Sequence, residues 1–524
     1  MVSNLQSAVG AFATADKDGE HSNGGGPTAM HVIVLGPTGG PLEDRVTGLL
    51  VRSLATNWAP NSVAAVDAGT LLSGIIHVLN ECENKDGIIS SGPFAGLQLP
   101  HKSTPANAAY IFQRIVGTVL ITHPHLDHVS ALAMNSPVLE MGYGPKTVAA
   151  LPSVVGAIKA HVFNDVIWPN LSDEDGGAGL ITYQRLVEGG NHMMGRGEAR
   201  GYVQAGEGLL ARCLSVSHGR CKANMDDNIY PDLLRRASSA ILAGDRHRLS
   251  VGTPGTRTPS DALHSPFPSR ELIWHTVDSS AFFIRDQDSG TEIIVFGDVE
   301  PDSLSLSPRN RKIWELAAPK IASRQLRAIF IECSYSDDIE DEFLFGHLCP
   351  RHLIEELGVL ARFVADAKGL RFPTTGKRKR RSSGLGLTTE PLSPKSKRSA
   401  LPSKSKSSSN QSPPCTRHSS AKGTDDAGEL FDSPLPARAL DPHALHRELK
   451  TAKGSLKEPT GAKHTAEIEM PLSDFSVYII HVKDDMTDGP PPGEQILQEL
   501  NEFGKTARLG CDFHVPKRGE SIYV

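Results

Sequence analysis

The segment Thr122 to Pro137, THPHLDHVSALAMNSP, constrains this chain more than any other, because it places three histidines and one aspartate within six residues. The run before it, Ile111 to Ile121, is apolar and rich in β-branched residues, which predicts a buried strand that delivers His123 at its end. Alternate side chains of an extended segment point the same way, so His123 and His125 can reach one metal ion together.

A helix expected after this strand turns the next two polar residues in another direction. Asp127 is a suitable N-cap, and VSALAM reads as the opening of the helix, so Asp127 and His128 are expected to face a second metal position. Imidazole and carboxylate suit zinc or a similar first-row ion. A polar loop with surface histidines is the alternative, and this spacing after a buried strand argues against it. The segment therefore predicts half of a two-metal site.

The string HPHLDH followed by VSALAMNSP resembles the signature of the class II cyclic-nucleotide phosphodiesterases, which have the metallo-β-lactamase fold. The resemblance covers about Met30 to Leu370 and about Pro471 to the end. It implies an α/β fold, a four-layer αβ/βα sandwich with long insertions. It also implies an enzyme that hydrolyses 3′,5′-cyclic nucleotides to 5′-nucleotides and so ends a cyclic-nucleotide signal, with cAMP as substrate and cGMP left open.

Asp67 ends a predicted apolar strand, SVAAVDAGT at 62–70, directly before a helix-like segment. Two interpretations stay open for its carboxylate. It can cap the helix that follows, or it can match the aspartate of the fold's first motif, which supports the metal-binding histidines from behind and fixes their tautomer.

The resemblance also supplies the missing ligands, each expected at the end of an apolar strand: His218 in GLLARCLSVSHG, Asp298 in TEIIVFGD and His481 in SVYIIHVKDD. It implies two ions, with zinc expected: His123, His125 and His218 hold one, and Asp127, His128 and His481 hold the other. Asp298 and a hydroxide are implied to bridge them, which makes Asp127 and Asp298 part of the catalytic set. Two such cations activate water and clamp the phosphate.

His347 precedes a predicted helix that begins at Pro350. Its place resembles that of a histidine near the scissile bond, not a ligand, in the phosphodiesterases, which implies a general acid for the leaving 3′-oxygen. The segment 147–170 is predicted to form an apolar helix followed by a Trp-Pro turn, and Trp168 and Asn170 in this turn are interpreted mainly as packing and turn residues. A substrate pocket in which the Trp168 ring stacks on a purine is the second interpretation.

Composition divides the 524 residues into one domain with additions. Residues 1–27 are predicted to form a disordered tail, and residues 28–524 a single domain interrupted by a mobile surface insertion at 220–270 and a disordered basic insertion at 372–440. Gly376 to Lys422 holds twelve Lys and Arg against one Glu, a charge of +11, so the remainder of a chain with net charge −6 carries about −17.

The seven cysteines form no CxxC pair, and no signal peptide or long apolar span is present, which predicts a soluble protein of the cytoplasm. KRKRR at 377–381 fits a nuclear-import signal or a solvated linker equally well. The acidic remainder argues against nucleic acid as a partner, and therefore against the alternative of a tRNA 3′-processing nuclease, although the basic insertion could supply the positive charge that such an enzyme needs. A metal-bound, catalytically silent binding protein is the other alternative, and no ligand is missing. A homodimer is compatible with the sequence, which does not reveal the oligomeric state.

Overall fold

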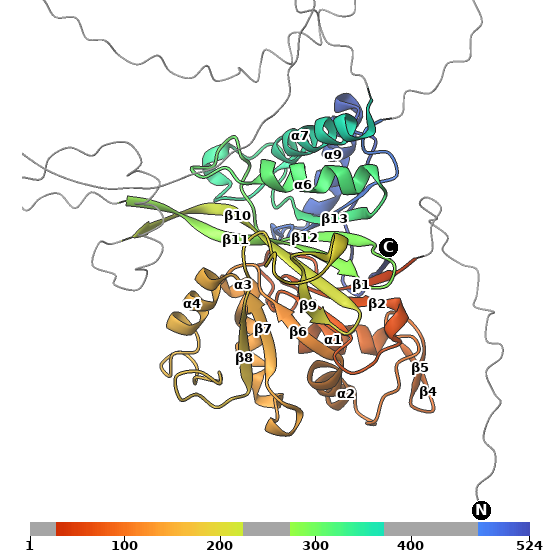
Figure 1. The fold of residues 1–524 in the computed structure, drawn as a ribbon, viewed down its shortest axis with the longest axis vertical. Helices are drawn as coiled ribbons and strands as arrows, with labels where there is room; N and C mark the ends of the chain where they lie inside the picture. The colour runs from red at the N-terminus through yellow and green to blue at the C-terminus, as the bar shows by residue number, and fades with distance from the viewer. Residues whose placement is uncertain (1–27, 224–272, 371–469) are drawn as a thin grey trace, which may run out of the picture. The chain divides into compact units, whose positions relative to one another are not determined.

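The computed structural model describes residues 28–223, 273–370 and 470–524, and these build two seven-stranded mixed sheets (Figure 1). The first sheet has the order β16 (Ser521–Tyr523), β1 (Met30–Gly36), β2 (Gly48–Ser53), β3 (Val63–Val66), β6 (Val116–Leu120), β7 (Lys146–Ala150) and β8 (Ile181–Arg185). The second has the order β15 (Asp512–His514), β14 (Ser476–Ile480), β13 (Leu326–Glu332), β12 (Glu292–Phe296), β11 (Ile273–Asp286), β10 (Leu209–Ala223) and β9 (Val203–Gly206). A small hairpin, β4 (Glu83–Lys85) and β5 (Ile88–Ser91), stands apart.

Helices cover the outer face of each sheet (Figure 1). On the side of the first sheet lie α1 (Leu72–Glu81), α2 (Thr104–Tyr110) and α4 (Pro152–His161), whereas α3 (Leu126–Met134) begins at the strand ends. On the side of the second sheet lie α6 (Asn310–Ala322), α7 (Pro350–Lys368) and α9 (Pro492–Ala507). The layers are thus helix, sheet, sheet and helix, and the predicted four-layer αβ/βα fold is confirmed.

The central strands of the second sheet are buried on both faces, and their residues alternate between two cores. On β11, Phe282 and Ile284 belong to the core shared with the first sheet, whereas Ala281 and Phe283 pack under the outer helices. The same alternation continues on β12 and β13, with Ile293, Val295, Ala328 and Phe330 on the inner side and Ile294, Phe296, Ile329 and Ile331 on the outer side. Burying one such side chain stabilises the fold by about 1.5–3 kcal/mol, so the sheet that carries the strand ends is rigid.

Two apolar runs were assigned to the wrong type of element. Only the second half of the strand predicted at 111–121 is a strand, because Ile111–Ile115 continues α2 as a π-helical turn before β6. The helix predicted at 147–170 starts as the parallel strand β7, and α4 begins only at Pro152. A buried parallel strand and a buried helix both read as continuous apolar runs, so periodicity does not distinguish them.

Three predicted ends also differ. The strand expected to stop at His218 runs on as β10 to Ala223, so the start of the 220–270 insertion was placed a few residues too early. The N-cap of α3 is His125, and Asp127 lies in the first turn. The sequence also predicts a helix from Gly493 through Phe503 that Gly504 closes, but α9 continues to Ala507. Gly504 lies inside it, where a Cβ would be 2.8 Å from the Phe513 ring, so this glycine serves packing.

The tail at 1–27, the remainder of the 220–270 insertion, the 372–440 insertion and the KRKRR motif lie outside the described residues. None of the helices in the described residues is both long and apolar enough to cross a membrane.

Candidate metal centre

The polar residues predicted for the site come together where strands of both sheets end. Asp67 follows β3, and His123 and His125 follow β6 in the first sheet. Asp298 follows β12 and His481 follows β14 in the second sheet. Asp67 and His481 both adopt left-handed backbone conformations, with φ of +60° and +59°. Such conformations are uncommon for residues other than glycine and persist only where surrounding contacts hold them.

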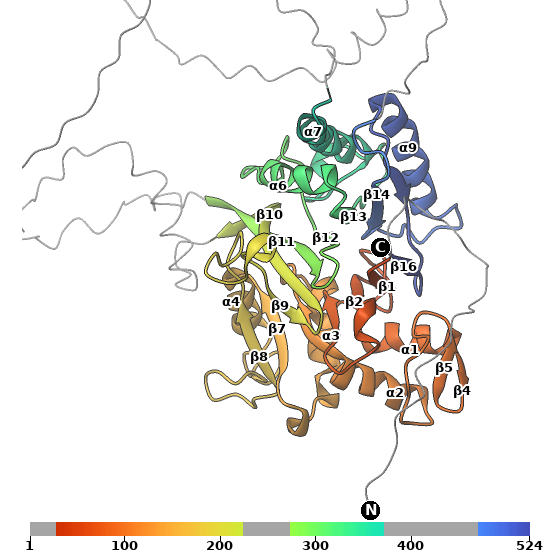
Figure 2. The same ribbon diagram turned by 45° about the vertical axis from the view of Figure 1, so that its right-hand side comes forward.

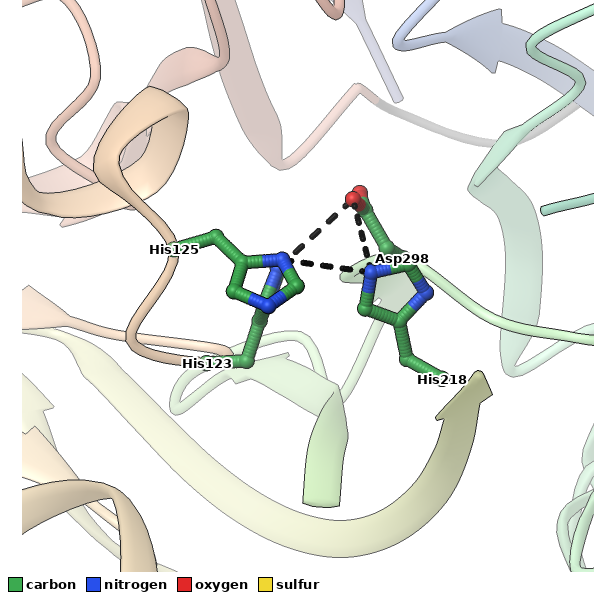
Figure 3. A group of neighbouring side chains, drawn as sticks. All are labelled: His123, His125, His218 and Asp298. Carbon is green, nitrogen blue, oxygen red and sulfur yellow. Dashed lines mark hydrogen bonds and ion pairs between the residues drawn. The ribbon is translucent and has the colours of Figure 1, made fainter. Parts of the chain in front are cut away.

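The first group consists of His123, His125, His218 and Asp298 (Figure 3), whose ligand atoms all lie within 4.8 Å of one another. Asp298 Oδ2 is 3.6 Å from Nε2 of both His123 and His218. His218 Nε2 is 3.3 Å from His125 Nδ1. His218 reaches this position from a bulge in β10, where the register with β11 shifts between Ser217 and Arg220. An irregularity of this kind re-aims a side chain without ending the strand.

The second group consists of Asp127, His128, His481 and the same Asp298. Asp298 Oδ1 is 3.2 Å from His128 Nε2, and Asp298 Oδ2 is 3.2 Å from His481 Nε2. Asp127 Oδ2 completes the group at 3.6 Å from His481 Nε2. The carboxylate of Asp298 therefore belongs to both groups, one on either side of it.

The unpartnered atoms of these side chains fit a divalent cation. His123 Nε2, His128 Nε2, His481 Nε2 and Asp298 Oδ1 are buried without a hydrogen-bond partner among the described residues. Burial lowers the pKa of His123 far below its ordinary value and lowers that of His218 to about 4, so both imidazoles are neutral, as ligands must be. Burial alone would raise the pKa of Asp298, but His128 and His481 hold it well below its usual range.

His128 shows how strongly the site attracts positive charge. Burial disfavours its protonation, yet Asp298 and Asp67 raise its pKa well above the ordinary value. Asp298 lies on the Nε2 side of His128, where a cation would neutralise it in place of this proton, so the donor set suits a divalent metal ion.

Outer contacts orient three of the imidazoles. Asp67 Oδ2 lies 2.8 Å from His128 Nδ1, while Asp67 Oδ1 accepts a 2.8 Å hydrogen bond from the Thr122 backbone N–H. Thr47 Oγ1 lies 2.7 Å from His481 Nδ1, and the Gly346 carbonyl lies 2.9 Å from His218 Nδ1. Each contact occupies Nδ1 and leaves Nε2 toward the cluster, which fixes the tautomer that can bind a metal. The sequence interpretation did not include Thr47 or Thr122, because a single threonine carries no recognisable spacing.

His347 lies beside the first group and forms a pair with Glu332, the last residue of β13. His347 Nδ1 is 3.0 Å from both Glu332 carboxylate oxygens and 3.8 Å from Asp298 Oδ2. Burial would lower the pKa of His347, but Glu332 and Asp298 raise it above the ordinary value. Glu332 was missed in the sequence, although a glutamate that ends the buried apolar run AIFIE is a detectable signal.

Comparison with known proteins decides the family. The family model described as "cAMP phosphodiesterases class-II" matches residues 30–192 and 225–373, which is more than half of the chain. The chain belongs to this family. Its fold, family and enzyme class, a cyclic-nucleotide phosphodiesterase, are therefore as predicted, and the tRNA nuclease and the silent binding protein are not supported.

Individual members of the class-II phosphodiesterases are moderately similar to this chain. A 3′,5′-cyclic-nucleotide phosphodiesterase of Schizosaccharomyces pombe is 30% identical over 341 residues, which cover 65% of this chain and 77% of the relative. A probable 3′,5′-cyclic-nucleotide phosphodiesterase of Yersinia pestis is 26% identical over 66% of this chain and 76% of its own length. The crystal structure of unliganded yeast PDE1 superposes with a TM-score of 0.56 at 18% identity, covering 95% of this chain and all of the other, which shows the shared fold.

Two residues considered for the substrate pocket of this phosphodiesterase make local contacts. Trp168 donates a 3.0 Å hydrogen bond from Nε1 to Ser136 Oγ and packs against the first core. Asn170 closes a turn: its Oδ1 accepts from the Ser172 hydroxyl at 2.7 Å, and its Nδ2 donates to the Glu174 carbonyl. These contacts agree with packing and turn roles, and a role in base stacking stays a prediction.

Proposed function

We propose that this phosphodiesterase hydrolyses cAMP at the two ligand groups that share Asp298, with a divalent cation, zinc, in each group. His123, His125 and His218 would hold one ion, Asp127, His128 and His481 the other, and Asp298 both. The observation that carries the proposal is the shared carboxylate, whose two oxygens approach imidazole nitrogens from both groups at 3.2–3.6 Å. When bound, the cations supply Lewis acidity toward phosphate oxygens and lower the pKa of water.

The residues of the chain account for the remaining chemistry. Hydrolysis forms a bond from a water oxygen to phosphorus and breaks the bond from phosphorus to the 3′-oxygen, which needs a proton to leave as a hydroxyl. Glu332 engages His347 through Nδ1, so the transferable proton of His347 resides on Nε2. Glu332 and Asp298 raise the pKa of His347, which favours the protonated form that a general acid requires. The product is the 5′-nucleotide.

Metal analysis of Asp298→Asn tests the assignment. A side chain that neutralises two cations should be essential for holding both, so we expect the folded variant to contain less than two ions per chain and to lose cAMP turnover. Asp474→Asn is the matched control, because Asp474 is exposed and pairs with Arg324 instead. Two ions per chain and a normal rate in Asp298→Asn would show that Asp298 is not the shared ligand.

A further inference from the structure

Lys483 lies beside the metal centre, two residues after His481. The segment that carries it runs along the loop after β1: His481 N–H donates to the Pro37 carbonyl at 2.7 Å and Gly39 N–H to the Val482 carbonyl at 3.0 Å. The Lys483 ammonium donates to the Gly39 carbonyl at 3.1 Å. Gly39 itself touches the centre, because a Cβ there would lie 2.6 Å from His481 Nε2.

A backbone contact connects Lys483 to Ser334, a residue that itself contacts the proposed general acid. The Lys483 N–H donates to the Ser334 carbonyl at 3.0 Å. The Ser334 hydroxyl lies 3.3 Å from His347 Nδ1 and donates to the His481 carbonyl at 3.0 Å. Ser334 thus links Lys483 to both His347 and His481.

The contact with Gly39 places the charge of Lys483 close to the second ligand group. The Gly39 carbonyl accepts from its ammonium, and a Cβ on the same Gly39 would lie 2.6 Å from His481 Nε2.

This ammonium has no carboxylate partner in the part of the chain that the structure describes. No described carboxylate oxygen lies within 4.0 Å of its nitrogen, and the ammonium donates to the uncharged Gly39 carbonyl. Lys159, Lys312 and Lys320, in contrast, are paired with carboxylates, Lys312 with Glu188 at 3.1 Å. A half-buried cation paired only with a carbonyl retains donors and charge for an anion.

We propose that Lys483 binds a non-bridging oxygen of the cyclic phosphate and anchors the substrate beside His481. The proposal rests on the proposed function, because it places the phosphate at the same two ligand groups. The phosphodiester carries one negative charge, and more charge develops on its oxygens as water attacks. A fixed ammonium stabilises that charge in both states, most strongly in the second. The Gly39 carbonyl holds the flexible lysine stem in place for this contact.

Lys483→Met tests the contact in the full chain loaded with metal. We expect unchanged metal content, a kcat/KM for cAMP lower by about 10- to 100-fold, and weaker inhibition by 5′-AMP and by inorganic phosphate by a similar factor, the range for a hydrogen bond to a charged group. Lys483→Arg should restore most of the phosphate affinity, because it restores the charge. Lys312→Met is the matched control on an exposed face of α6 and should leave all these values unchanged.

Two outcomes would overturn the proposal. One is a Lys483→Met variant with normal inhibition by 5′-AMP and phosphate. The other is a Lys483→Met variant that loses metal and phosphate affinity together, with no recovery in Lys483→Arg. That result would mean that Lys483 only stabilises the loop around Gly39. Failure of the two-metal assignment is distinguishable from both, because it would be seen as a missing ion in the unmodified protein.

Discussion

The role of His347 can be tested with two substrates that differ in their leaving group. If it protonates the leaving 3′-oxygen, His347→Ala should keep its metal and lose cAMP turnover by about 10²- to 10⁴-fold, the contribution of a positioned general acid. An aryl phosphodiester with an acidic leaving group needs no such proton, so its hydrolysis should be much less impaired. Rates of both substrates with one preparation decide the question, and equal slowing would assign His347 to phosphate binding or to shaping its loop.

Glu332 should control the pH at which that acid works. Burial lowers the pKa of His347, whereas the Glu332 carboxylate raises it. Removing the negative charge of Glu332 should therefore lower the pKa of His347. The protonated form is then lost at lower pH, and the alkaline limb of the kcat profile of Glu332→Gln should move toward acid. Glu355→Gln is the control, since Glu355 is paired with His352 outside the cluster. A profile that keeps its alkaline limb while kcat falls would leave Glu332 with a purely structural role.

Residues of the site were predictable from sequence where chemistry and spacing coincide. Four of them were recognisable because they lie together in one short segment: His123, His125, Asp127 and His128. His218, Asp298 and His481 are single polar residues near strand ends and needed the family resemblance. Thr47 and Glu332 needed the structure, because their meaning depends on which imidazole they contact across distant sequence.

At the scale of elements, the crossing of two chain segments positions both His218 and His347. Gly219 and Gly346 meet backbone to backbone: a Cβ on Gly346 would lie 2.5 Å from both the N and Cα atoms of Gly219. Gly346 also has φ of +86°. Sequence reasoning located the loop but did not predict this crossing. It also assigned the wrong type of element to the residues directly before β6 and to β7 itself. In each case the structure depends on contacts between elements that are distant in sequence.

Gly346→Ala should therefore separate the two segments and move the imidazoles on either side. We expect cAMP turnover to fall by at least about tenfold, since misplacement by about 1 Å has large effects on catalysis. Gly358→Ala is the control within α7, where a Cβ meets no atom within 4 Å and a helical alanine stabilises by about 0.5–1 kcal/mol. Normal kinetics in Gly346→Ala would mean that the crossing tolerates the extra atom.

At the scale of the whole molecule, the proposed ligands tie the two halves together. His123, His125, Asp127 and His128 come from the first sheet and α3, while His218, Asp298 and His481 come from the second sheet. Ions that bind only this arrangement stabilise the folded state, so a chelator should lower the melting temperature, and added zinc should restore it with the activity. An unchanged melting temperature after verified metal removal would show that the halves hold together without the ions.

The site and the first sheet can be completed only after the last strands have been synthesised. His481 and β14 lie near the end of the chain, and β16 pairs with β1, so residues 521–523 border residues 31–33 in the same sheet (Figure 2). During synthesis the ribosome releases β1 long before β16 exists, and the second ligand group cannot form until His481 has emerged. A polypeptide that stops before this point has the complete HPHLDH motif but lacks β16 and the proposed ligand His481. Copies that terminate before His481 should therefore show no cAMP turnover.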